Sequence, residues 1–244
     1  MTVPNIIKKI LTLLVFCTFL FYPYTVSYAG TIYAVSASYS DVALATSSAG
    51  YGDTVIVPSG SATWTSTLYI TKHITLQGMG IGNTIVTAAP SIGNDAMINY
   101  KPDALSRSAN GLFRVTGFEF HGSGERIIAP VNDTSTHVDR IRIDHNKFDG
   151  VSYGVRFHGL ISGLVDSNIF KDVTIHEVYI LGYESTSWNQ LSDEPGSGNA
   201  IFIEDNTFID AGSIAAGGQG GAYVLRFNNI SGIDDYTFLD AHGN

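Results

Sequence analysis

Polar side chains that could do chemistry occur at every second position in three short segments. They are YGVRFHG (153–159), HEVYILG (176–182) and YTFLDAHG (236–243). Side chains two residues apart in a β-strand point to the same face. Arg156 and His158 would therefore share one face of the first segment, while Val155 and Phe157 point the other way. The same alternation turns Tyr179 outward in the second segment, and Asp240 and His242 outward in the third.

Aligning the terminal glycines of these segments predicts two columns of outward side chains. One column contains Arg156, Tyr179 and Asp240, and the next contains His158, Leu181 and His242. A fourth segment, GSIAAGG (212–218), falls between the second and the third and brings only small residues. We expect it to leave an open floor for a ligand.

The chemistry that fits these residues is proton abstraction next to a carboxylate. That reaction needs a cation to neutralise the carboxylate and a base within reach. Arg156 supplies a cation, and a histidine or Tyr179 could move the proton, as in a lyase acting on a polyuronate. A glycoside hydrolase needs two carboxylates at a set separation, and only Asp240 is clearly on this face. The alternative is that Arg156 and His158 are ordinary exposed residues.

A long insertion, GYESTSWNQLSDEPGSGNA (182–200), follows the second segment. It contains Trp188 and Glu184. An aromatic ring on a loop beside a groove can stack against the apolar face of a sugar. We expect Trp188 and Glu184 to contact substrate, with Trp188 covering the side of the domain as the alternative.

An internal repeat indicates which elements position these residues. Four segments align without gaps: IRIDHNKFDG (141–150), GLVDSNIFKD (163–172), IFIEDNTFID (201–210) and YVLRFNNISG (223–232). They share Asn146, Asn168, Asn206 and Asn228, at spacings of 22, 38 and 22 residues. The segment FRVTGFEFHG (113–122) is a weaker copy, with Phe118 in the place of the asparagine.

A period near 22 residues suits a coil of three short strands, stacked so that each coil buries its apolar side chains against its neighbours. Asparagine tolerates the left-handed backbone conformation of a tight turn. We therefore expect the shared asparagines to form the turns, with their amides hydrogen-bonded from coil to coil. The apolar residues two places later, Phe148, Phe170, Phe208 and Ile230, should stack inside.

This pattern resembles the right-handed parallel β-helix proteins of the pectin-lyase-like (pectate lyase) superfamily. The segments GDTVIVPSG (52–60) and LYITKHITLQGMG (68–80) resemble the opening coils of that superfamily, in which a short helix caps the first coil. Residues 40–49 are the candidate helix, with Ser40 as its N-cap. The resemblance covers residues 31–244. It implies that the asparagine turn separates the second and third sheets, and that substrate binds on the outer face of the first sheet.

Three acidic residues precede the shared asparagines by two places. Together with Arg226 they form a further outward column: Asp144, Asp166, Glu204 and Arg226. Carboxylates one strand apart could bind Ca²⁺, and the alternative is a solvated face whose charge Arg226 balances. We expect no metal ligands beyond that, because no spacing in the chain resembles a zinc site.

Residues 1–29 have the pattern of a secretory signal peptide. Lys8 and Lys9 precede an apolar run at 10–21, and small residues occupy the positions before a cleavage point after Ala29. Cleavage would remove two of the 13 basic residues and none of the 22 acidic ones, so the net charge would move from −9 to −11. It would also remove Cys17, the single cysteine. A strongly acidic chain argues against nucleic acid and anionic membrane as partners.

These observations predict a secreted protein with one all-β domain at 30–244, a right-handed parallel β-helix of roughly 22-residue coils. The sequence stops at LDAHGN, where another strand begins, so we also expect a domain that is incomplete at its C-terminal end. The favoured function is binding or cleavage of extracellular polysaccharide, with lyase-like chemistry in a groove on the first sheet. The alternative is a non-catalytic module for glycan binding or adhesion.

Overall fold

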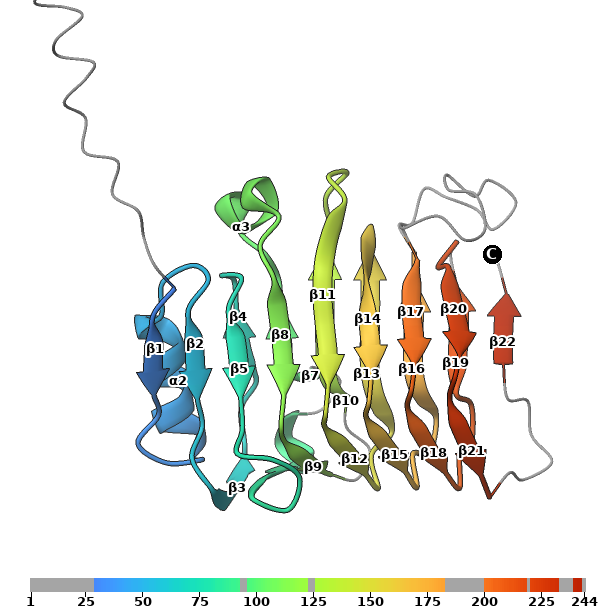
Figure 1. The fold of residues 1–244 in the computed structure, drawn as a ribbon, viewed down its shortest axis with the longest axis horizontal. Coiled ribbons are helices and arrows are strands. Elements are labelled where there is room, and N and C mark those ends of the chain that lie inside the picture. The colour runs from blue at the N-terminus through green and yellow to red at the C-terminus, as the bar shows by residue number, and fades with distance from the viewer. Residues whose placement is uncertain are drawn as a thin grey trace, which may run out of the picture.

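The computed structural model describes residues 29–92, 96–122, 126–182, 200–218, 220–232 and 239–242. Within these ranges the strands form three sheets in which every pairing is parallel (Figure 1). From residue 54 on, the chain runs through one strand of each sheet in turn and then returns to the starting sheet one layer further along. The protein is therefore an all-β parallel β-helix, as the repeat predicts.

The first sheet has seven strands, and its outer face carries the residues singled out above. In chain order they are β4 (Leu68–Ile70), β7 (Ala96–Tyr100), β10 (Arg126–Asn132), β13 (Tyr153–Gly159), β16 (His176–Leu181), β19 (Ala215–Gly218) and β22 (Leu239–His242).

The second sheet has eight strands and faces the viewer in Figure 1. They are β1 (Thr31–Tyr33), β2 (Thr54–Ile56), β5 (Thr75–Gln77), β8 (Phe113–Thr116), β11 (Val138–Asp144), β14 (Ile161–Asp166), β17 (Ile201–Glu204) and β20 (Tyr223–Arg226). The third sheet contains β3 (Gly60–Trp64), β6 (Thr84–Ala88), β9 (Glu119–His121), β12 (Lys147–Asp149), β15 (Ile169–Lys171), β18 (Thr207–Ile209) and β21 (Asn229–Ser231).

The interior is a continuous apolar core along the axis of the β-helix. Its clearest feature is a row of phenyl rings on the third sheet, one from each successive strand. The centroid separations are 5.5 Å from Phe120 to Phe148, 4.8 Å from Phe148 to Phe170 and 5.1 Å from Phe170 to Phe208. All four side chains are buried, and burying each one contributes roughly 2–3 kcal/mol. The inward stacking expected after the shared asparagine is therefore observed.

Asn146, Asn168 and Asn206 are buried, Asn228 is half-buried, and all four are hydrogen-bonded to one another from coil to coil. The Nδ2 amide of Asn146 donates to Oδ1 of Asn168 at 3.2 Å, and Asn168 donates to Asn206 at 3.0 Å. Each Nδ2 also donates to a backbone carbonyl of the preceding coil, such as that of Ile143 for Asn168, at 2.8 Å. The polar side chains inside the turn are thus satisfied.

The left-handed residue of each turn is the one before the asparagine, which corrects the sequence expectation. Positive φ angles of 53–58° occur at His145, Ser167, Asp205 and Phe227. This arrangement lets the asparagine amide fold back onto the carbonyl two residues earlier, as Asn168 does with Asp166 at 3.0 Å. The asparagine thus supplies the hydrogen bonds of the turn, and the preceding residue adopts the strained, left-handed conformation.

A helix, α2 (Tyr39–Ser48), lies at the N-terminal end of the β-helix beside β1 and β2 (Figure 1). Its Val42 and Ala45 are buried in the core. The N-cap is Ser38 and not the expected Ser40, because the Ser38 hydroxyl accepts the hydrogen bond from the backbone N–H of Asp41. A second short helix, α3 (Ala104–Ala109), precedes β8, and a 3-10 turn spans Pro90–Ile92. No helix in the described ranges is long and apolar enough to cross a membrane.

Candidate functional site

The register of the first sheet matches the two expected columns. Arg156 pairs with Tyr179, Tyr179 pairs with Ala216, and Ala216 pairs with Asp240. The neighbouring column contains His158, Leu181, Gly218 and His242. For Asp240 and His242 the structure gives the backbone position. Trp188 and Glu184 lie in 183–199, outside the described residues.

Arg156 belongs to a cluster of cations and aromatic rings on this face. We call it the arginine–tyrosine cluster, and its members are Arg126, Tyr153, Arg156, His176 and Tyr179. The guanidinium carbon of Arg156 lies 5.9 Å from the ring centroid of Tyr179, and that of Arg126 lies 5.3 Å from the ring of Tyr153. The His176 ring stacks on Tyr179 at 4.9 Å, and the two tyrosine rings are 6.0 Å apart. The cluster thus joins two cations to a continuous aromatic surface.

Simple alternation does not place Tyr153 and His176 on the outer face. It is interrupted at the start of the strand, because Gly154 and Val155 both face the interior. A side chain at Gly154 would come within 2.6 Å of a ring carbon of the buried Phe170, and Val155 is fully buried. Tyr153 is consequently turned outward, and His176, its register partner on β16, lies beside it.

Arg156 is half-buried and has no hydrogen-bond or carboxylate partner among the described residues. Its Nε is buried without an acceptor. Burial, followed by repulsion from Arg126, lowers the pKa of the Arg156 guanidinium, which nonetheless stays charged because arginine is not deprotonated in proteins. A guanidinium in this state has unused donors with the geometry to bind a carboxylate.

His158 lies beside an acidic residue at the edge of the same face. Its Nδ1 is 3.9 Å from the Asp133 carboxylate, which also binds the Lys101 ammonium at 2.5 Å. The expected open floor at the next coil is not present, because every residue of β19 is buried. The prediction that the small residues of this strand leave an open floor for a ligand is therefore wrong.

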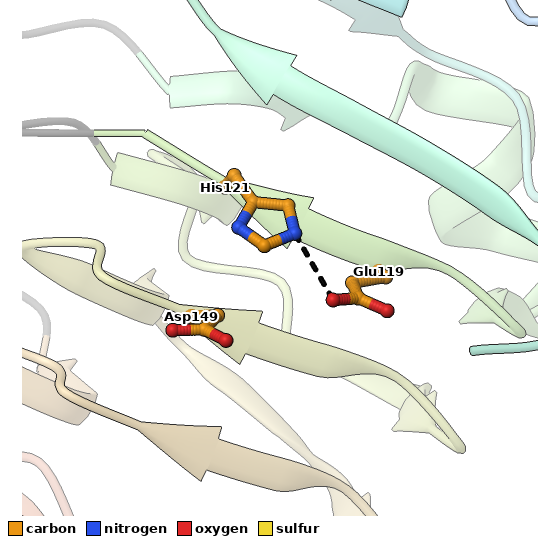
Figure 2. A group of neighbouring side chains, drawn as sticks. All are labelled: Glu119, His121 and Asp149. Carbon is orange, nitrogen blue, oxygen red and sulfur yellow. Dashed lines mark hydrogen bonds and ion pairs between the residues drawn. The ribbon is translucent and has the colours of Figure 1, made fainter. Parts of the chain in front are cut away.

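One group of potential metal ligands lies on the third sheet: Glu119, His121 and Asp149 (Figure 2). His121 Nε2 is 3.0 Å from Glu119 Oε1. The Lys147 ammonium lies between the two carboxylates, 3.0 Å from Glu119 and 2.8 Å from Asp149. Hydrogen bonds to these carboxylates, that to Asp149 first, raise the pKa of Lys147. The lysine thus already neutralises the position that a metal ion would take.

The acidic column of the second sheet is paired with arginines: Arg226 balances Glu204 at its exposed end, as expected, whereas Asp144 and Asp166 are buried and not solvated. Asp144 is fully buried and accepts two hydrogen bonds from Arg114, at 2.6 and 2.5 Å. Arg142 binds Asp166 at 3.0 and 2.8 Å in the same way. Burial alone would raise the pKa of Asp144, but hydrogen bonds from Arg114 and His145 hold it below its usual value. A Ca²⁺ ion in this column would have to displace the arginines.

No family model matches the chain, and no curated protein matches it. Among solved structures, it is distantly similar to a protein from Parabacteroides merdae that is provisionally described as a glycosyl hydrolase. The TM-score is 0.43 at 10% identity, over 74% of this chain and 81% of that one.

Proposed function

We propose that this chain is a secreted protein that binds carboxylate-bearing polysaccharide along the outer face of its first sheet. The observation that carries the proposal is the arginine–tyrosine cluster. Arg156 has no carboxylate partner among the described residues, and the rings of Tyr153 and Tyr179 beside it supply apolar surface for a sugar ring to pack against. This combination of cations and rings suits a chain of uronic acid residues.

The same arrangement would support cleavage by β-elimination, the lyase chemistry of the superfamily that the repeat resembles. Arg156 would neutralise the uronate carboxylate and so acidify the neighbouring C–H. A base would remove that proton, the electrons of the C–H bond would form a C=C bond, and the C–O bond would break, with the released oxygen taking up a proton from water. His176 or Tyr179, within the cluster, or His158 is placed to act as the base. The backbone positions of Asp240 and His242 would extend the same two columns.

The test is incubation of the mature protein with pectate, alginate and other polyuronates, with and without calcium. The lyase proposal predicts absorbance from an unsaturated product. It also predicts that at least one of the variants Tyr179→Phe, His176→Ala and His158→Ala removes this signal while polymer binding persists.

The second candidate function is glycan binding without catalysis. It is favoured because, among the described side chains of this face, no pair of carboxylates is placed for hydrolysis. Retained polymer binding with no product across the whole panel would establish it and rule out the lyase. Absence of both binding and product would rule out the proposed function altogether.

A further inference from the structure

A pocket of about 530 Å³ lies on the outer face of the second sheet, over β11, β14, β17 and β20. Figure 1 shows these four strands side by side on the face turned to the viewer. The volume is within the range of roughly 300–1,000 Å³ that is usual for small-ligand sites. Its lining combines apolar and cationic side chains, in particular Leu164, Phe202, Arg140, Arg142 and Arg226.

Arg140 reaches this pocket because the strand is irregular at that point. The pairing of β11 with β14 shifts between Val138 and Ile141, and Arg140 has a φ of 60°. A residue with a side chain is strained in this conformation, and a β-bulge redirects the side chain that it carries. Arg140 is exposed, whereas the flanking Ile141 is buried in the core.

The other charged groups of the lining already have partners. Arg142 binds Asp166, and Arg226 binds Glu204 at 2.9 and 2.7 Å. The Asp139 carboxylate is bonded to His137 at 2.8 Å and to Asn110 at 2.9 Å. Arg140 makes no hydrogen bond or ion pair with any other described residue. Among the described charged groups of the lining, the Arg140 guanidinium is therefore available to bind a ligand.

The charges and the apolar surface define the ligand. A single unused guanidinium matches one carboxylate, to which it can donate two parallel hydrogen bonds. A dianionic phosphate is disfavoured by the nearby carboxylates of Asp139 and Glu204, which also line the pocket. Leu164 and Phe202 are neighbours in the outward column of the sheet and offer an apolar surface for the C–H face of a ring.

We propose that this pocket is a second saccharide site that binds a uronic acid residue, with Arg140 on the carboxylate and Leu164 and Phe202 against the ring. The site lies on a different sheet from the arginine–tyrosine cluster, so either one can fail without the other. Two such sites would let one molecule hold two segments of an acidic polysaccharide, which raises the overall affinity without new contacts.

The test is calorimetric titration with a trisaccharide of galacturonic acid. Wild type should bind two molecules per chain, and Arg140→Gln and Arg156→Gln one each. The double variant should bind none. Arg140→Lys should weaken the second site by about tenfold, because it keeps the charge but loses the paired donors. Lys171→Gln, on the third sheet, is the matched control and should retain both sites.

Two titrations define the ligand at the pocket in the Arg156→Gln background. The carboxyl-reduced trisaccharide should not bind, and inorganic phosphate should not displace the acidic one. Binding of the reduced sugar, displacement by phosphate, or a site count that Arg140→Gln leaves unchanged would overturn the inference. If the single variant Arg156→Gln bound no trisaccharide at all, the inference about the pocket would be overturned, but the proposal for the first sheet would still hold. Unchanged thermal unfolding of Arg140→Gln would show that the fold is intact.

Discussion

Glu177, at the start of β16, is a buried carboxyl group that forms no ion pair with a cation of the described residues. Its side chain is 1% exposed. Oε1 accepts a hydrogen bond from the backbone N–H of Gly212 at 3.2 Å, and Oε2 has no hydrogen-bond partner within the part of the chain that the structure describes. Burial raises the pKa of Glu177 to about 7, despite the opposing backbone hydrogen bonds. The protonated form is therefore favoured in the folded state.

This pKa gives the protein a pH-dependent stability. Because the pKa of Glu177 in the folded state is above its ordinary value of 4.5, the contribution of this group to stability is fully present below pH 4.5. It falls as the pH rises to about 7 and stays low above it. Glu177→Gln removes the titration, so the variant should exceed wild type by on the order of 2 kcal/mol at mildly alkaline pH. Urea unfolding across this pH range checks it, and parallel pH profiles for the two proteins would contradict it.

The chemistry-bearing residues were only partly predictable from the sequence. Arg156, His158 and Tyr179 follow from alternation and a shared terminal glycine, and the structure confirms their columns. Tyr153 and His176 do not, because the inward turn of Gly154 depends on its packing against a ring from another coil. Whether any of these residues binds or cleaves a polysaccharide remains a prediction.

The asparagine turns tie each coil to the next, and their effect on stability should depend on position. Asn168 is buried, and its amide contacts Ile143, Asp166 and Asn206. Asn168→Ala leaves these buried groups without partners and should cost about 2–4 kcal/mol in the free energy of unfolding.

Asn228, which is only half-buried in the last of the described asparagine turns, serves as the comparison. Asn228→Ala should cost less than half as much as Asn168→Ala, because water can satisfy the groups that it exposes. Chemical denaturation of the two variants measures the difference. Equal losses would refute the view that the buried hydrogen bonds between coils stabilise the β-helix.

The arginine–carboxylate pairs of the second sheet should make a large contribution where they are buried. Asp144→Ala leaves Arg114 unpaired and should cost about 3–5 kcal/mol. Glu204→Ala breaks the more exposed pair with Arg226 and should cost less than about 1 kcal/mol. Thermal unfolding of both variants, with calcium and with a chelator, tests the pairing. A midpoint that rises with calcium in wild type but not in Asp144→Ala would show that the column binds metal after all.

At this level the sequence predicted the repeat, the three strands per coil and the inward phenyl rings. It placed the left-handed conformation at the asparagine, which tolerates that conformation. In the structure the residue before the asparagine adopts it, and the asparagine makes the hydrogen bonds. The sequence also predicted that Arg226 would balance the acidic column, as Arg226 does with Glu204, but it missed the pairs that Arg114 and Arg142 make with Asp144 and Asp166. Arg114 and Asp144 are separated by one whole coil with an irregular spacing of 30 residues, and only the three-dimensional register brings them together.

Taken as one molecule, the β-helix is an acidic rod that carries arginines on two outward faces. The full chain has a net charge of −9, which repels polyanions in general. An acidic polysaccharide should therefore associate only where unpaired guanidinium groups outweigh that repulsion, at Arg156 and at Arg140. Binding of a neutral polymer would not depend on either residue.

The most direct test of the proposed function is the affinity of wild type and Arg156→Gln for immobilised polygalacturonate, with Lys171→Gln as the charge-matched control. The cluster on the first sheet predicts at least about tenfold weaker binding for Arg156→Gln, with Lys171→Gln close to wild type. Equal affinity of Arg156→Gln and wild type would contradict the assignment of the polysaccharide site to the first sheet.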